Sequence, residues 1–143
     1  MPMISVQLGA EPNADLSRSA ARIVTDLTTR VLRKDPNVTA VAVQYVAPTD
    51  WFIAGKSLYE RRTASFFVDT RISDGTNSKD EKAAYVAAIF KAMSDLLGGV
   101  HPESYVHADD VRADAYGYEG VTQERRYIES RPRAAKTLAA VDS

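Results

Sequence analysis

The sequence of 143 residues contains no cysteine and no long apolar run. The lack of cysteine excludes a thiolate nucleophile, a zinc site with cysteine ligands and a disulfide framework. No segment approaches the roughly 20 apolar residues that a membrane-spanning helix needs, and the N-terminus lacks the apolar segment of a signal peptide. We therefore expect a cytoplasmic protein that has no membrane partner.

Neither sign of charge is in excess. The chain has 18 Lys and Arg against 19 Asp and Glu, so its formal net charge is −1. A nucleic-acid-binding module is expected to carry a basic face, and we expect no nucleic-acid partner here. The length is near the commonest size of a single domain, and 45% hydrophobic residues are enough for one core without disulfides or metals.

Histidine is scarce, and the two histidines are His101 and His107. They could form a metal site with Asp109 and Asp110, because alternation places His107 and Asp109 on one face of a strand. No further residue completes a defined ligand set, so we expect neither a metal nor a cofactor. Two histidines without a nucleophile motif support no Ser-His-Asp triad, and there is no glycine-rich phosphate loop.

The first third of the chain predicts strand, helix and strand. Apolar and polar residues alternate over residues 3–8, as in a short half-buried strand. Apolar residues then recur on one helical face over residues 16–32, with Asn13 as the candidate N-cap. Pro36 ends that helix, because proline disfavours helical geometry in the residue before it. The β-branched residues of 38–46 predict the second strand.

The remaining chain repeats this order. The predicted elements are an irregular short strand and turn at 48–59, a strand at 62–70, a helix between Ser78 and Gly98, a strand at 104–111, and candidates for a small strand at 116–118 and a helical tail from 124. Ser78 and Glu81 have the spacing of a capping box. The two glycines that start at Gly98 are a typical helix stop.

Two strand–helix–strand units predict an α+β fold. Side by side, the two consecutive βαβ units form one four-stranded mixed sheet with both helices on one face. The other face then has no cover within one chain. We expect its side chains to be apolar and to drive self-association.

Pro2 carries the strongest chemical signal. Methionine aminopeptidases usually remove Met1 when a small side chain follows, which would leave Pro2 with a free secondary amine. An ordinary α-amino group titrates near ~7.7–8.0, and burial lowers that value because the cation is desolvated. Such an amine could act as a general base near neutral pH. Many proteins begin Met-Pro for no chemical reason, so this dipeptide alone identifies nothing.

A Met-Pro start on a strand, followed by two βαβ units, resembles the tautomerase superfamily, which has the 4-oxalocrotonate tautomerase and macrophage migration inhibitory factor fold. Residues 50–57 and 64–71 are similar to segments of its cis-3-chloroacrylic acid dehalogenase group. Residues 101–118 resemble the last strand and closing turn of the inhibitory factor. The resemblance covers residues 2–120 and leaves 121–143 as a C-terminal tail, a candidate for helix and subunit contacts.

The resemblance implies a homotrimer with a pocket between neighbouring subunits and Pro2 at its floor. Arg71 corresponds to an arginine that binds a substrate carboxylate, a role that suits its planar fork. Tyr105 and His107 correspond to positions that hydrogen-bond a substrate oxygen. Without the resemblance, Arg71 would be interpreted as a solvated strand-end arginine and Tyr105 as an ordinary aromatic residue.

Three aromatic residues complete the implied pocket. Trp51, Phe52 and Tyr118 are candidates for its apolar wall, and packing in the core explains them equally well. The paired arginines Arg125 and Arg126 are interpreted as solvated surface, with a contact to a neighbouring subunit's pocket as the alternative.

The sequence departs from the dehalogenase pattern at several positions. No second arginine follows Arg71 closely, Thr28 stands where those enzymes have a histidine that helps to activate water, and Ala115 stands near their glutamate. Val38 replaces the aspartate of the related decarboxylase. The remaining set favours proton transfer over hydration.

We therefore expect a tautomerase, an isomerase that interconverts the keto and enol forms of a small 2-oxo or enol carboxylate. One alternative is an enzyme that dehalogenates or hydrates cis-3-haloacrylates. The other is a trimeric binding protein that has kept the fold and lost the chemistry.

Overall fold

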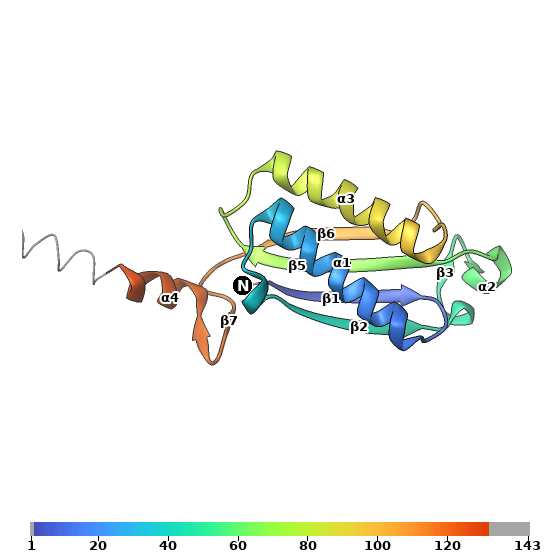
Figure 1. The fold of residues 1–143 in the computed structure, drawn as a ribbon, viewed down its shortest axis with the longest axis horizontal. Coiled ribbons are helices and arrows are strands. Elements are labelled where there is room, and N and C mark those ends of the chain that lie inside the picture. Colours follow the sequence, from blue (N-terminus) through green and yellow to red (C-terminus); the bar gives the residue numbers. More distant parts are fainter. Residues whose placement is uncertain (1, 132–143) are drawn as a thin grey trace, which may run out of the picture.

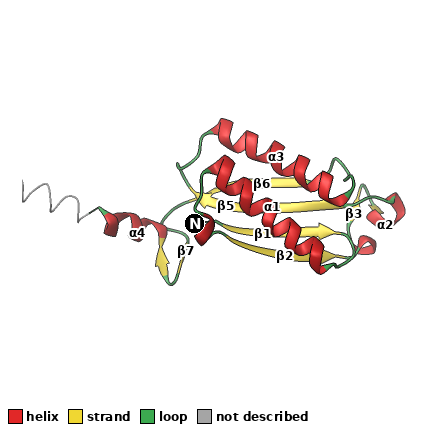
Figure 2. Ribbon diagram, viewed as in Figure 1, coloured by secondary structure: helices red, strands yellow, loops and turns green. Residues whose placement is uncertain are grey.

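The computed structural model describes residues 2–131, which form a four-stranded mixed sheet with two long helices on one face (Figure 1, Figure 2). The strands, in sheet order, are β2 (Ala40–Val46), β1 (Met3–Gly9), β5 (Ser65–Ser73) and β6 (Tyr105–Val111). β1 pairs in parallel with β2 and β5 in parallel with β6, whereas β1 and β5 are antiparallel. The helices are α1 (Ala14–Leu32) and α3 (Lys79–Leu97). The predicted α+β class and pair of βαβ units are confirmed.

Smaller elements lie at the two ends of the sheet. They are η1 (Pro36–Val38), η2 (Pro48–Asp50), β3 (Phe52–Ile53), β4 (Lys56–Ser57), α2 (Leu58–Arg61), β7 (Gly117–Tyr118), β8 (Val121–Thr122) and α4 (Gln123–Ser130). The β3–β4 hairpin and α2 lie where β1 ends, whereas β7 and α4 extend beyond the end where β1 begins (Figure 1). The β7–β8 hairpin spans the predicted boundary at residue 120, and residues 132–143 of the predicted tail lie outside the described residues. Within 2–131, no helix is long and apolar enough to cross a bilayer.

Local capping signals place the long helices as predicted. The Asn13 side chain accepts hydrogen bonds from two amides of the first turn of α1, at 2.9 and 3.1 Å. Ser78 and Glu81 form both bonds of the capping box at the start of α3. Gly98 ends α3 with a positive φ of 74°, a conformation that glycine adopts without steric cost.

The second strand begins two residues later than the predicted range 38–46. The Asp35 carboxylate accepts a hydrogen bond from the Asn37 amide at 2.9 Å, which closes the short turn of Pro36–Val38. The chain therefore becomes extended only at Ala40, where pairing with β1 begins.

The third strand is displaced in the same direction from the predicted range 62–70. Ser57 caps a single helical turn, Leu58–Arg61, that periodicity did not reveal. Arg62 then reverses the chain with a φ of 54°. The strand therefore occupies Ser65–Ser73 and keeps the predicted apolar centre.

The core lies between the helices and the even-numbered positions of β1 and β5. Its fully buried side chains include Ile4, Val6, Leu8, Val24, Phe66, Val68, Ile72, Tyr85, Ile89 and Met93. The alternation along β1 therefore predicted correctly which of its side chains are buried under the helices.

A buried hydroxyl network crosses this core. The Thr28 hydroxyl donates to the Val24 carbonyl at 2.7 Å, so the Tyr85 hydroxyl donates to Thr28 at 2.9 Å. The Thr70 hydroxyl is 2.8 Å from the same phenol and donates to it. Burial raises the pKa of Tyr85, so the phenol stays protonated. The Thr28 hydroxyl is thus occupied with core contacts.

Replacing Tyr85 with phenylalanine should lower the free energy of unfolding by about 1–3 kcal/mol, because it leaves two buried threonine hydroxyls short of a partner. Chemical denaturation monitored by circular dichroism measures the change. The control is Tyr59→Phe, because the Tyr59 side chain is largely exposed. Equal stability of the two variants would contradict the network's contribution.

The face of the sheet opposite the helices is more polar than predicted. Its central positions are Met3, Ser5, Gln7, Phe67, Asp69, Arg71, Tyr105, His107 and Asp109, which alternate with buried or half-buried residues along their strands. The expectation of an apolar open face is therefore wrong over much of the sheet. This face provides charged and hydrogen-bonding groups.

Candidate active site

Pro2 is buried directly before β1. Its carbonyl accepts a hydrogen bond from the Ala40 amide at 3.1 Å, which attaches it to the start of β2. On the other side of β1, the following residue, Met3, pairs with Arg71 of β5. The candidate base and the candidate carboxylate-binding arginine therefore lie at the same end of the sheet.

Arg71 lies on the open face of the sheet. Its side chain is 58% exposed, and its Nη2 is 3.5 Å from Oδ2 of Asp69. Asp109 of β6 pairs with Arg71 across the strands. An exposed ion pair of this kind contributes little to stability. The guanidinium therefore keeps donors available for a carboxylate ligand.

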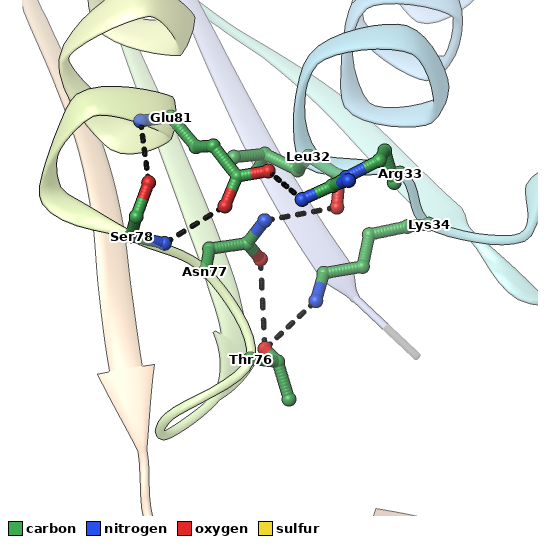
Figure 3. A network of polar contacts seen from close by, with 7 residues as sticks. All are labelled: Leu32, Arg33, Lys34, Thr76, Asn77, Ser78 and Glu81. Atoms are coloured by element: carbon green, nitrogen blue, oxygen red, sulfur yellow. Dashed lines mark hydrogen bonds and ion pairs between the residues drawn. The ribbon is translucent and has the colours of Figure 1, made fainter.

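Lys34, which sequence reasoning did not select, lies at this same end of the fold. Its Nζ donates a hydrogen bond to Oγ1 of Thr76 at 2.8 Å in the turn after β5 (Figure 3). Burial lowers the pKa of Lys34, although the Glu81 carboxylate opposes that shift. Glu81 itself pairs with Arg33 (Figure 3). A lysine directly after a helix is ordinary in a sequence, so nothing distinguished it before folding.

Three other predicted site residues meet at the opposite end of the sheet. Trp51, Tyr105 and His107 line a cavity of about 360 Å³ together with Gln7 and Phe67. The rings of Phe67 and His107 are in edge contact, with centroids 4.9 Å apart. The structure thus brings together an indole, a phenol and an imidazole on the open face.

A second cavity of about 530 Å³ shares Trp51 and Tyr105 with the first. Its lining consists of Trp51, Phe52, Ile53, Ala54, Arg61, His101, Glu103 and Tyr105. Gly9 allows the close approach of Trp51, since a Cβ at Gly9 would lie 2.9 Å from Cε3 of Trp51 and 2.5 Å from Cδ1 of Leu58. Of the three aromatic residues predicted for the pocket wall, Trp51 and Phe52 therefore line a cavity with Tyr105, and Tyr118 does not.

The two groups of predicted site residues are far apart within one chain. Tyr105 pairs with Phe67, and Phe67 pairs with Gln7. Gln7 is five positions beyond Pro2, roughly 16 Å along a strand that rises about 3.3 Å per residue. One chain therefore does not bring Pro2 and Tyr105 to the same small substrate.

Tyr118 lies on the β7–β8 hairpin, where its ring stacks on the Arg126 guanidinium at 3.8 Å. Arg126 Nη2 also donates to the Tyr118 carbonyl at 2.8 Å. Arg126 Nε and Gln123 Nε2 are buried and have no hydrogen-bond partner among residues 2–131. Both residues line a cavity of about 590 Å³ with Ser73 and Asp74. The turn after β5, which lacks a second arginine of its own, thus has Arg126 beside it.

The histidines and aspartates considered for a metal site are dispersed. His101 lines the second cavity, whereas His107 and Asp109 lie on the open face of β6. Among the described residues, no group of three or more His, Cys, Asp or Glu is placed to hold a metal ion.

The comparisons with known proteins identify the fold. No protein-family model and no curated protein matches the sequence. A crystal structure of Pt0534 inactivated by 2-oxo-3-pentynoate has a TM-score of 0.76 at 14% identity, over 87% of this chain and 98% of that one. A wild-type fused 4-OT in a symmetric trimer has a TM-score of 0.73 at 18% identity, over 85% and 96%.

A macrophage migration inhibitory factor homologue from Prochlorococcus marinus has a TM-score of 0.68 at 18% identity, over 84% of this chain and 97% of that one. At such identities the likeness establishes the fold alone. The chain has the fold of the 4-OT and inhibitory factor structures.

Proposed function

We propose that the protein is a homotrimeric tautomerase-superfamily enzyme that isomerises a small 2-oxo or enol carboxylate. The amine of Pro2, exposed by removal of Met1, is the general base. The observation that carries this proposal is the burial of Pro2 at the start of β1, one residue from the partner of Arg71, on a fold shared with 4-OT structures.

The proposed chemistry is a proton transfer between carbon and oxygen. The neutral Pro2 amine removes a proton from the carbon beside the 2-oxo group and returns it there in the reverse direction. Arg71 binds the carboxylate through its paired N–H donors. His107 or Tyr105 contacts the carbonyl oxygen, where charge develops.

The site is proposed to form between two copies of the chain. The distance between Pro2 and Tyr105 within one chain supports this arrangement, because a small substrate cannot span it. The symmetric trimer of the structurally similar fused 4-OT supports it as well. Trp51, Tyr105 and His107 of one copy then face Pro2 and Arg71 of the next.

Dehalogenation or hydration of a cis-3-haloacrylate is the second candidate, favoured by the similarity of residues 50–57 and 64–71 to the dehalogenase group. The buried contacts of the Thr28 hydroxyl weigh against it, because this position does not offer a base to water. A trimeric binding protein is the non-enzyme alternative.

Phenylenolpyruvate and cis-3-chloroacrylate test the proposal together. We expect loss of the enol absorbance with the first and no halide release with the second, in protein whose intact mass shows that Met1 is absent. A ketone-activated alkyne, 2-oxo-3-pentynoate, should add to the Pro2 amine and give a single adduct located by peptide mass spectrometry. An adduct elsewhere, or no ketonisation, would contradict the proposal.

A further inference from the structure

The Glu103 carboxylate accepts the single hydroxyl hydrogen of Tyr105. The Tyr105 hydroxyl is hydrogen-bonded to Oε2 of Glu103 at the entrance to β6. A carboxylate has no hydrogen, so the phenol must be the donor. The same contact raises the pKa of Tyr105, which keeps the phenol protonated. The Tyr105 oxygen therefore has only lone pairs left for a ligand in the cavities that it lines, and it accepts hydrogen bonds there.

The segment that holds Glu103 is tied to its surroundings by main-chain hydrogen bonds. The Glu103 amide donates to Nδ1 of His101 at 3.0 Å, and its carbonyl accepts from the Ser65 hydroxyl at 3.1 Å. The neighbouring Ser104 hydroxyl donates to the His101 carbonyl at 2.7 Å. The Glu103–Tyr105 pair is thus held in place at the cavity wall.

The charged and titratable groups around Glu103 leave its carboxylate available as a base. Those that line its cavity are Arg61, His101 and Tyr105. Arg61 donates through both Nε and Nη2 to the Ile53 carbonyl, at 3.1 and 2.8 Å. Within the described part of the chain, no salt bridge involves Glu103.

We propose that Tyr105 and Glu103 form a proton relay that accepts the hydroxyl proton of an enol substrate. This inference rests on the proposed function. As protonated Pro2 delivers its proton to the substrate carbon, the enol O–H bond breaks and its electrons form the C=O bond. The enol proton passes to the Tyr105 oxygen while the proton of Tyr105 passes to the Glu103 carboxylate. Glu103 then carries one more proton and Pro2 one fewer, and exchange with water restores both.

In this relay, Tyr105 accepts the hydrogen bond of the enol hydroxyl; it does not donate a hydrogen bond to an enolate oxygen. Its substrate is a carboxylate whose enol hydroxyl is a hydrogen-bond donor, and His107 is left as the donor to the product ketone. Glu103 and Tyr105 lie two positions apart at the start of β6, so both relay residues come from the same copy of the chain. Only Pro2 comes from the next copy. Glu103 is therefore the group that receives the proton, and Tyr105 is the group that contacts substrate.

The test compares Glu103→Gln, Glu103→Asp and Tyr105→Phe in phenylenolpyruvate ketonisation, with Glu11→Gln as a matched control at an exposed acid. We expect kcat to fall about 100-fold or more in Glu103→Gln, with KM little changed. Glu103→Asp should recover much of the rate, and combining Glu103→Gln with Tyr105→Phe should cost no more than either alone. The acid limb of the pH–rate profile should disappear in Glu103→Gln.

A titration of phenolate absorbance reports on the pair without any turnover. The difference between wild type and Tyr105→Phe isolates Tyr105, whose pKa should fall when Glu103 becomes glutamine. An unchanged rate and pH profile in Glu103→Gln, in protein that still requires Pro2, would overturn the relay and leave the proposed function standing. Absence of ketonisation in wild-type protein without Met1 would overturn both.

Discussion

Protein that retains a residue before Pro2 should show no ketonisation above background. The Pro2 nitrogen is then a tertiary amide, which has no basic lone pair to accept a proton. Replacing Pro2 with alanine keeps an amine after Met1 is removed, and we expect kcat/KM to fall about 100-fold or more, within the range of a general base. Steady-state ketonisation of phenylenolpyruvate, on samples checked by intact mass, measures both effects.

The matched comparison for this experiment is the same extended chain before and after proteolytic release of Pro2. Size-exclusion chromatography must show that all samples have one oligomeric state. Recovery of turnover on release would support Pro2 as the base. Full turnover in the alanine variant, with assembly unchanged, would show that the base lies elsewhere.

Replacing Arg71 with alanine should lower kcat/KM for a 2-oxo or enol carboxylate roughly 10- to 100-fold, mainly through KM. A net loss equal to one hydrogen bond to a charged group, about 1.5–3 kcal/mol, corresponds to this range, and the variant loses the paired donors that make this contact. Arg71→Lys should be intermediate, because lysine keeps the charge but lacks the planar fork. Steady-state kinetics with the carboxylate and with its methyl ester measure the effect.

Stability should change little in these variants, because Arg71 is more than half exposed and its pair with Asp69 is on the surface. Arg18→Ala on α1 is the control, since that side chain is 76% exposed and lies on the helical layer. Unchanged KM in Arg71→Ala, or equal loss for acid and ester, would favour the solvated strand-end interpretation.

Local sequence signals predicted the elements because each acts over a few residues. The Asn13 cap, the Ser78 capping box and the alternation along β1 all appear in the structure. The strand starts at Ala40 and Ser65 were missed, because side-chain hydrogen bonds in short turns decide where extension begins.

The candidate site was predicted only in part. Trp51, Tyr105 and His107 share a cavity, but the contacts of Lys34 and Arg126 join segments that are distant in the sequence. No spacing rule connects such segments, because the turns and the sheet bring them together. The polarity of the open face was missed for a related reason, since it depends on which alternate residues the helices cover.

By itself, the sequence determined a chain with one core, two βαβ units and a proline at position 2. Only the tertiary structure decided that Pro2 is buried beside the end of β5, because this follows from the antiparallel pairing of β1 with β5. The same pairing places Tyr105 at the far end of the sheet. Strand order and direction are properties of long-range packing, and they place the predicted site residues in two groups at opposite ends of the sheet.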